Sequence, residues 1–236
     1  MDNIVTRRPS RDRASTSRAT AAPSADAGSL YTRGGRRKYL NADERRRVLA
    51  GLDDLPSDQA LFVLTLCWTG ARISEVLALM PDAFQVDQGI VTFRTLKRRC
   101  HSMREVPVPP DLIAALDATF NIAAAQRGDG PSGKRLWPWH RVTAWRVVKR
   151  AMTEAGVTGT PASPRGLRHA FGVGTLQAGI PITLVQRWLG HSRITTTAIY
   201  AAVVGPEEIA FAQRFWGIGD DTGVPLSPAP ACRPSV

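Results

Sequence analysis

Five residues of the sequence have side chains that could act together on a phosphate ester: Arg72, Lys97, Arg168, His191 and Tyr200. A guanidinium presents a planar pair of N–H groups that fits a phosphate, and a phenol becomes a nucleophile once its proton is lost. His191 and Tyr200 share the short stretch HSRITTTAIY, in a chain with three tyrosines. Each residue alone is weak evidence, because a tyrosine on a helix usually packs in the core and a lysine in a turn is usually solvated. Together they are candidates for chemistry at a phosphate, provided that the fold gathers them.

The composition favours an anionic partner. The 236 residues carry a net charge of +11, and 27 of the 31 basic residues are arginines. Nucleic acid is therefore the first candidate for the partner. The three cysteines are widely spaced and form no CxxC pair, which indicates a reducing compartment and no structural zinc. The longest apolar run, ALFVLTLCW, is too short to span a bilayer, so we expect a soluble cytoplasmic protein. With nucleic acid as its expected partner, it would associate with the nucleoid.

The chain is expected to form one folded domain with two tails. Residues 1–38 contain nine basic and three acidic residues and almost no large apolar side chains, which predicts a disordered basic arm. Residues 218–236 contain four prolines and predict a disordered Pro-rich tail. Residues 39–217 then form the single domain, which is basic in its own right.

Helical patterns begin this domain. Asn41 can cap a first helix, and residues 57–68 are apolar on most faces, which predicts a central second helix. Gly70 interrupts the chain, and Arg72 then lies at the start of a third helix whose other residues belong to the core. The apolar stripe of this third helix is Ile73, Val76, Leu77 and Leu79.

Residues 83–108 have strand character. Short alternating runs around DQG and RRCHSMR predict an antiparallel sheet with two turns, and Lys97 lies where the second strand meets its hairpin. After the sheet, one helix is predicted to begin at Pro110 and another to lie in WPWHRVTAWRVVKRAMTEAG. Three further helices are predicted in the last third of the chain, and they end at Gly179, at Gly190 and near Tyr200. The four tryptophans of this region, Trp137, Trp139, Trp145 and Trp188, are expected in the core or in an interface.

In their order and spacing, these segments resemble the tyrosine recombinase (phage integrase) family. The matching stretches are TGARISEVLAL, the hairpin Lys97 followed by REVPVP, GLRHAFGVGTLQAG and VQRWLGHSRITTTAIY. The resemblance covers about residues 40–216 and corresponds to the family's catalytic domain. It implies a mainly α (α+β) fold, a helical bundle with a small three-stranded antiparallel sheet.

The resemblance also implies roles for individual residues in site-specific DNA recombination. Tyr200 would attack a DNA phosphodiester and form a 3′-phosphotyrosine, and Lys97 would protonate the leaving 5′-oxygen. Arg72, Arg168 and His191 would donate hydrogen bonds to the phosphate, whose equatorial oxygens gain negative charge in the transition state. Glu75, one turn after Arg72, would orient the site. Neither ATP, a metal nor another cofactor is implied.

One position departs from the family pattern. Members usually have a histidine three residues before the second arginine, and here that position is Arg165. A guanidinium has a pKa above about 12 and cannot act as a base, so the proton acceptor for Tyr200 stays open between water and His191. We do not expect His169 to fill the gap, because a shift of one residue turns a helical side chain by about 100°.

The expected partner is double-stranded DNA. The resemblance implies self-assembly on DNA as a synaptic tetramer, with a monomer possible when free, and a helix over 206–216 that docks on a neighbouring subunit or folds back on its own domain. Family members carry a further helical domain before the catalytic one, whereas here only the basic arm precedes Tyr39, and we expect this arm to add salt-sensitive affinity. The candidate DNA-binding residues are Arg98, Arg99, Arg146, Lys149, Arg150, Arg187 and Arg193.

Three alternatives stay open from the sequence. The first alternative is a non-enzymatic DNA-binding regulator, because the stretch LRHAFGVGTLQAGIPITLVQRWLGH superficially resembles a helix-turn-helix. A recombinase that binds DNA without cutting it, as Arg165 could bring about, is another. The third is a type IB topoisomerase, which uses the same tyrosine chemistry without strand exchange.

Overall fold

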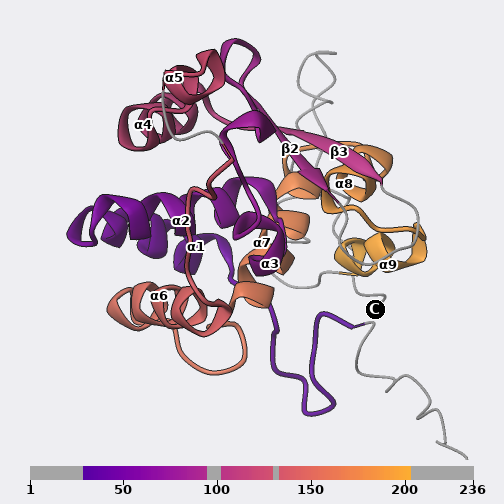
Figure 1. Ribbon diagram of the computed structural model, residues 1–236. Helices are drawn as coiled ribbons and strands as arrows, with labels where there is room; N and C mark the ends of the chain where they lie inside the picture. The colour runs from indigo at the N-terminus through magenta and orange to yellow at the C-terminus, as the bar shows by residue number, and fades with distance from the viewer. Residues whose placement is uncertain (1–28, 95–101, 130–132, 203–236) are drawn as a thin grey trace, which may run out of the picture.

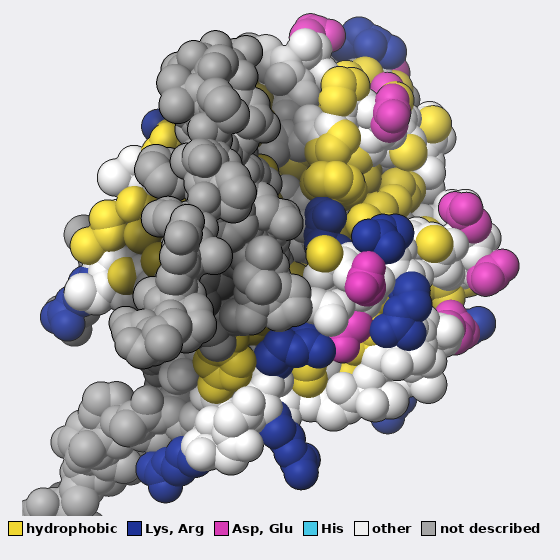
Figure 2. All heavy atoms as spheres, turned by 180° about the vertical axis from the view of Figure 1, so that it is seen from behind, with side chains coloured by type: hydrophobic (Ala, Val, Ile, Leu, Met, Phe, Trp, Pro, Cys, Tyr) yellow, Lys and Arg dark blue, Asp and Glu magenta, His cyan; other side chains and the backbone are white. Residues whose placement is uncertain are grey.

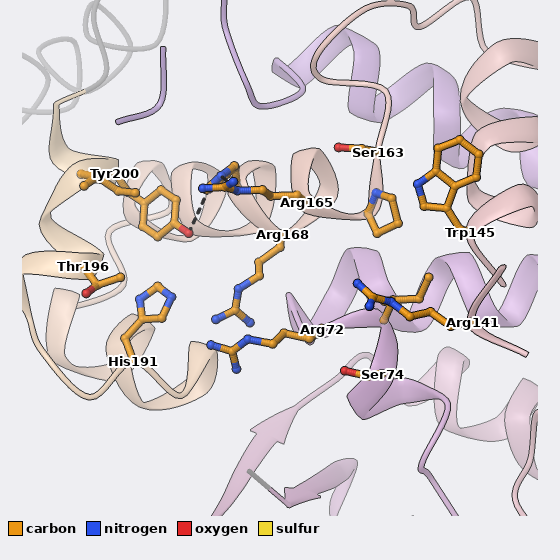
Figure 3. Close-up of a pocket in the computed structure, with 14 residues that line it drawn as sticks. Arg72, Ser74, Arg141, Trp145, Ser163, Arg165, Arg168, His191, Thr196 and Tyr200 are labelled. Atoms are coloured by element: carbon orange, nitrogen blue, oxygen red, sulfur yellow. Dashed lines mark hydrogen bonds between the residues drawn. The ribbon is translucent and has the colours of Figure 1, made fainter. Parts of the chain in front are cut away.

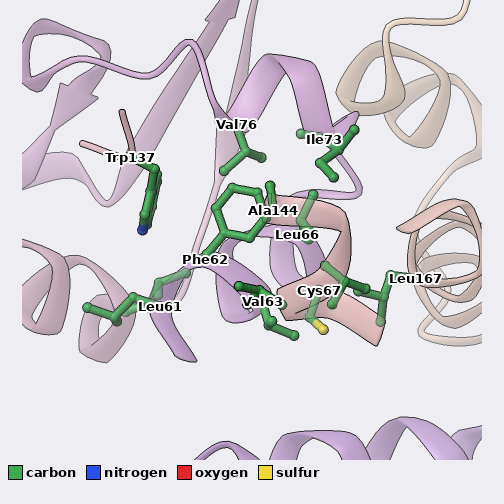
Figure 4. Packing of buried hydrophobic residues seen from close by; sticks show 14 of the residues in the cluster. Leu61, Phe62, Val63, Leu66, Cys67, Ile73, Val76, Trp137, Ala144 and Leu167 are labelled. Atoms are coloured by element: carbon green, nitrogen blue, oxygen red, sulfur yellow. The ribbon is translucent and has the colours of Figure 1, made fainter. Parts of the chain in front are cut away.

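A helix that is apolar on most faces lies at the centre of the molecule. This helix, α2 (Ser57–Thr69), buries Leu61, Phe62, Val63 and Leu66, and Phe62 meets the ring of Trp137 edge-on at 5.3 Å (Figure 4). It packs against α4, α6 and α7 in the computed structural model, which describes residues 29–94, 102–129 and 133–202 (Figure 1). The bounds of these partners are Pro110–Phe120 for α4, Arg141–Glu154 for α6 and Pro164–Gln177 for α7. The predicted central helix is confirmed.

The N-terminal helix α1 (Ala42–Ala50) begins where its sequence predicts. The side chain of Asn41 accepts from the backbone N–H of Glu44, and the Glu44 carboxylate accepts from the backbone N–H of Asn41. This reciprocal pair satisfies two N–H groups that have no partner inside the helix. A 3₁₀ turn, Gly51–Asp54, then leads into α2.

A three-stranded antiparallel sheet lies beside the helices, as predicted. Its order is β1 (Phe84–Gln85), β2 (Ile90–Arg94) and β3 (Met103–Pro107), and Val91 pairs with Val106. In β3 the side chains alternate, so that Arg104 and Val106 face inward. Short 3₁₀ turns, Pro81–Ala83 and Val86–Gln88, flank β1.

The remaining helices are short. The helix after Arg72 is only one turn, α3 (Ile73–Val76), and therefore shorter than its apolar stripe suggests. The last predicted helix is α9 (Thr195–Ala198), and a 3₁₀ turn, Ile199–Ala201, carries Tyr200. The two others are α5 (Ile122–Arg127) and α8 (Ile182–Leu189). Gly179 and Gly190, with φ of 80° and 65°, follow α7 and α8 as the sequence predicts.

A small second core explains why part of the expected N-terminal arm is packed. Leu30, only 2 % exposed, and Tyr39 lie in one apolar cluster with Phe171, Leu189 and Tyr200. The prediction of a disordered arm is therefore wrong for residues 29–38, because one leucine and two tyrosines suffice to anchor that segment beside α7. Residues 1–28 and 203–236, with the helix expected over 206–216, lie outside the described residues. In the part of the chain that is described, every helix is too short or too polar to cross a membrane.

Candidate active site

One cavity gathers most of the residues that the sequence singles out. It has a volume of about 580 Å³ and brings together Arg72, Arg165, Arg168, His191 and Tyr200 (Figure 3). These residues come from the start of α3, from α7, from the turn after α8 and from the 3₁₀ turn after α9. The other lining residues are Ile73, Ser74, Arg141, Trp145, Ser163, Pro164, His169, Thr196 and Ile199.

Arg168 is buried at the ends of two helices. Its guanidinium donates to the carbonyl oxygens of Gly70 (2.6 Å) and Leu189 (2.7 Å), where α2 and α8 end. Helix C-termini carry partial negative charge, which compensates for part of the cost of burying the guanidinium. Burial, together with the nearby charge of Arg72, lowers the pKa of Arg168 to about 10, so Arg168 stays charged at neutral pH. Three of its five N–H groups remain for a ligand in the cavity.

Glu75 holds Arg72 in place. Its carboxylate accepts from the Arg72 backbone N–H (2.8 Å) and from the Arg72 guanidinium (2.8 Å). Burial raises the pKa of Glu75, but hydrogen bonding and charge from Arg104 and Arg72 outweigh it and hold that pKa below its usual value. Glu75 is thus an anion at neutral pH and orients Arg72, the supporting geometry that the resemblance implies.

Arg104 is a site residue that sequence reasoning missed. It donates to Glu75 Oε2 (2.6 Å) and to the Trp188 carbonyl oxygen (2.7 Å), and it lies over the Phe93 ring. The Arg104 side chain is 4 % exposed, so a buried ion pair ties β3 to α3, and the hydrogen bond to the Trp188 carbonyl oxygen ties β3 to α8. The sequence did hold a signal, because alternation in MREVP puts Arg104 on the same inward face as Val106.

His191 lies over the ring of the candidate nucleophile. Its ring stacks on Tyr200 at 6.3 Å between centroids, and its Nδ1 is 3.0 Å from the Thr197 hydroxyl. Burial, with the charges of Arg168 and Arg72, lowers the pKa of His191 to about 3. The imidazole is therefore neutral at neutral pH, and one ring nitrogen is a donor.

Tyr200 is buried and contacts a residue that the sequence analysis excluded. Its hydroxyl lies 3.2 Å from Nδ1 of His169, and Arg165 Nε donates to the other ring nitrogen of His169 at 3.2 Å (Figure 3). The one-residue shift therefore does not turn His169 away from the site, whereas the prediction that His169 does not replace the missing proton acceptor stays a prediction. The reason is that His169 lies four residues after Arg165, so both are on one face of α7, and the 3₁₀ turn of Tyr200 packs on that face beside Gly172. Burial raises the pKa of Tyr200 above its usual value, although Arg168, Arg165 and Arg72 oppose this.

Gly172 makes room for the Tyr200 ring. A Cβ built on Gly172 would lie 2.6 Å from two carbons of that ring, whereas a Cβ on Gly174 would meet nothing within 4 Å. Overpacking of this kind costs about 1–3 kcal/mol, and about 1.4 kcal/mol is a tenfold change in a population. We therefore expect Gly172→Ala to displace Tyr200 and to raise its rate of nitration by tetranitromethane about tenfold or more.

Mass spectrometry of the peptide that contains Tyr200 measures the nitration rate. Gly174→Ala in the same helix is the matched control and should leave that rate unchanged. Equal rates for the two variants and the parent chain would show that the ring is not held against Gly172.

The predicted DNA-binding residues that the structure describes do not line the cavity. Arg146, Arg187 and Arg193 are exposed but do not line it, Lys149 donates to the Ala162 carbonyl oxygen, and Arg150 pairs with Glu154. The face seen in Figure 2 mixes Lys and Arg side chains with Asp and Glu, so basic residues alone do not identify a DNA-binding face. Lys97, Arg98 and Arg99 lie outside the described residues.

Two residues on α6 extend the cavity instead. Arg141 and Trp145, one helical turn apart, line it, and Trp145 is 48 % exposed. Of the four tryptophans expected in the core or an interface, Trp137 is buried in the core, whereas Trp145 is exposed and faces the cavity, so for Trp145 only the interface remains as a prediction. Across residues 29–94, 102–129 and 133–202, no group of three or more His, Cys, Asp or Glu side chains could hold a metal ion.

Comparison with known proteins agrees with the sequence motifs. Residues 38–205 match the family model described as "Phage integrase family". The chain is 37 % identical over 183 residues to tyrosine recombinase XerD of Mycobacterium tuberculosis, which covers 70 % of this chain and 57 % of that protein. It is 31 % identical over 206 residues to an integrase/recombinase of Escherichia coli, and this alignment covers 70 % of this chain and 59 % of that protein. The chain thus spans less than two thirds of the length of these relatives.

Solved structures have the same fold. The crystal structure of XerA recombinase superposes with a TM-score of 0.63 at 22 % identity, over 75 % of this chain and 64 % of that one. XerH site-specific recombinase bound to its difH substrate gives 0.59 at 20 % identity, over 79 % of this chain and 59 % of that one. The family match and the identity to XerD together show that the chain belongs to the phage integrase family of tyrosine recombinases.

Proposed function

We propose that this protein is a site-specific DNA recombinase that cleaves and rejoins DNA strands through a covalent link to Tyr200. The observation that supports this most directly is the shared cavity of Tyr200, Arg72, Arg168 and His191. A DNA-binding regulator would need no phenol beside two guanidiniums, so this cavity favours catalysis over binding alone.

The proposed reaction is a transesterification. The Tyr200 oxygen bonds to phosphorus, the bond from phosphorus to the 5′-oxygen breaks, and the products are a 3′-phosphotyrosine and a 5′-hydroxyl. The phenol proton leaves to solvent, and the 5′-oxygen takes up a proton, which we assign to Lys97 from the resemblance. A second 5′-hydroxyl reverses these steps on a new strand without an external energy source, because the phosphotyrosine retains the ester bond.

The cations of the cavity stabilise the transition state of this reaction. Arg168 and Arg72 point N–H groups at one end of the cavity beside the Tyr200 hydroxyl (Figure 3). Each such donor, preorganised and partly shielded from water, contributes about 10²–10³-fold to rate. His191 adds a neutral donor when the Thr197 hydroxyl donates to Nδ1, because the imidazole proton is then on Nε2.

Double-stranded DNA is the proposed partner. Support comes from relatives whose structures were solved with DNA, among them XerH with difH and the Tn1549 transposon integrase with transposon right end DNA. We further propose assembly on DNA as a synaptic tetramer, association with the nucleoid, and a basic arm that adds to affinity. The end of the domain at residue 217 and the tail over 218–236 stay predictions, whereas its beginning moves to about residue 29.

Arg141 is proposed to hold the DNA backbone next to the reacting phosphate. Neutralising one phosphate contact changes the slope of log affinity against log salt concentration by about 0.9. Arg141→Ala should therefore weaken binding to a duplex and flatten this slope by about one unit. Arg150→Ala is the matched control, because Arg150 lies on the same helix, is paired with Glu154 and does not line the cavity. A fluorescence-anisotropy titration at several salt concentrations measures both slopes, and an equal loss for both variants would contradict the assignment.

The proposed function is tested without knowledge of the target site. The full chain is incubated with nicked duplexes of randomised sequence around the nick, so that the short strand released after cleavage diffuses away. A covalent protein–DNA band on a denaturing gel, with the nucleotide mapped to Tyr200 by mass spectrometry, is the expected result. No band at any sequence would favour the regulator, and site-independent relaxation of a supercoiled plasmid would favour the topoisomerase.

A further inference from the structure

A chain of hydrogen bonds on α7 leads to the Tyr200 oxygen. Arg165 and His169 are four residues apart and therefore lie on one face of the helix. Arg165 Nε donates to His169 Nε2 at 3.2 Å, and His169 Nδ1 lies 3.2 Å from the Tyr200 hydroxyl. The His169 and Tyr200 rings lie 5.7 Å apart, and His169 is 6 % exposed. Both residues of this contact are largely buried, and both also line the cavity.

The direction of the first bond fixes the direction of the second. The Nε–H group of arginine can only donate, so His169 Nε2 must offer its lone pair. A neutral imidazole carries a single proton, which is then on Nδ1. The Nδ1–H group faces the Tyr200 oxygen and donates to it.

Surrounding charges keep His169 neutral. Burial, then the charges of Arg165, Arg168 and Lys38, lower the pKa of His169 to about 4. The imidazole therefore carries one proton at any pH well above 4. In this state His169 has no lone pair directed at Tyr200 with which to take up the phenol proton.

We propose that His169 is a hydrogen-bond donor that stabilises the Tyr200 phenolate, and that Arg165 sets it in this role. The proposal rests on the proposed function, because a phenolate is needed only if Tyr200 attacks phosphorus. Tyr200 keeps its position in the site, but its activation does not use a neighbouring base. The phenol proton goes to solvent in the cavity, and the anion left behind is held by the His169 N–H group.

The charges around Tyr200 act in the same direction. Arg165 and Arg168 approach it from α7 and Arg72 from the start of α3, and the neutral His191 ring covers its face. All three cations favour the phenolate and oppose the effect of burial on the pKa. Strand cleavage is then expected to rise tenfold per pH unit, up to the pKa of Tyr200, because only the phenolate reacts.

Titration of Tyr200 tests the donor role without DNA. Absorbance at 295 nm is followed against pH for the full chain, and the curve of Tyr200→Phe in the same background is subtracted to remove the other two tyrosines. A hydrogen bond to a charged group stabilises it by about 1.5–3 kcal/mol, and one pKa unit corresponds to about 1.36 kcal/mol. We therefore expect His169→Leu to raise the pKa of Tyr200 by about one to two units.

Two further variants separate a donor from a packing residue. His169→Asn can place an amide N–H near the Nδ1 position, so the pKa of Tyr200 in this variant should lie close to that in the parent chain. Arg165→Met removes the bond that fixes the tautomer, so it should raise the pKa of Tyr200 in the native background and by less in the His169→Leu background. Thermal melting shows which variants fold. If His169→Leu does not fold, His169→Gln replaces it, because its side chain is polar but carries the amide at the Nε2 position and not at the Nδ1 position.

The sign of the shift decides the outcome. A lower pKa in His169→Leu or His169→Gln would show that His169 accepts from the phenol, and an unchanged pKa would show that it only packs; either result overturns the proposal. The adduct assay reports separately on the proposed function. If the pKa of Tyr200 shifts as expected but no adduct forms, the proposed recombinase function is rejected and the donor role of His169 is kept. If an adduct forms but the pKa of Tyr200 does not shift, the recombinase function is kept and the donor role is rejected.

Discussion

Tyr200→Phe abolishes the covalent protein–DNA adduct, which is the largest effect that we expect from any single substitution. The change removes one oxygen, and with it the only atom of this residue that can bond to phosphorus. The ring remains between His191 and Gly172, so packing is kept. His169 Nδ1 loses its buried partner, so we expect the free energy of unfolding to fall by about 1–3 kcal/mol.

The control for this prediction is a second phenol, which is partly buried. Tyr31→Phe also removes a hydroxyl that lies 3.4 Å from a second polar group, the Tyr39 hydroxyl, but Tyr31 does not line the cavity. Its adduct yield on the randomised nicked duplexes should equal that of the parent chain. Adduct formation by Tyr200→Phe would assign the nucleophile to another residue and would end the proposed mechanism.

Arg168→Lys is expected to reduce strand cleavage by about 10²–10³-fold and also to destabilise the fold. The guanidinium binds the carbonyl oxygens of Gly70 and Leu189 and still offers N–H groups to the cavity. A lysine ammonium is a compact point charge, and it cannot span both carbonyl oxygens and the phosphate with the geometry of the planar fork. One buried carbonyl left without a donor lowers the free energy of unfolding by about 1–3 kcal/mol.

Arg72→Lys separates the catalytic loss from the structural one. The Arg72 side chain is 29 % exposed, and Glu75 retains its bond to Arg104 in this variant. We expect a similar loss of cleavage, about 10²-fold, with a much smaller loss of stability. Single-turnover cleavage and urea unfolding, measured on both variants, give the two quantities. Stability losses of equal size would contradict the view that Arg168 joins the ends of α2 and α8.

Much of the fold could be predicted from short-range patterns. The capping pair of Asn41 and Glu44 spans three residues, and the glycines after α7 and α8 mark the ends of these helices by their backbone conformation alone. Alternation over five residues was enough to predict the paired strands. Each of these features is decided by interactions within about one helical turn or between adjacent strands, so the sequence carries it directly.

That four of the five candidate catalytic residues share a cavity could also be predicted, but by motif rather than by physics. Arg72, Arg168, His191 and Tyr200 were chosen because their order resembles a family, and the cavity does gather them. Exposed basic residues on α6 were chosen by charge alone, and this overlooked Arg141 and Trp145, which line the cavity. Charge identifies candidates for DNA binding, whereas the direction in which a helix face points depends on what packs against its other faces.

The sequence by itself determined the elements, the family and the residues with reactive side chains. Only the tertiary structure decided which of these residues touch. His169 and Tyr200 are 31 residues apart, and Arg104 contacts Trp188 across 84 residues and Glu75 across 29. Such contacts depend on how the 3₁₀ turn of Tyr200 crosses α7 and how β3 lies beside α8, and these packing angles arise from the whole core. The physical reason is that helical periodicity fixes only the directions in which side chains leave an element, and the partner in each direction is supplied by a distant part of the chain.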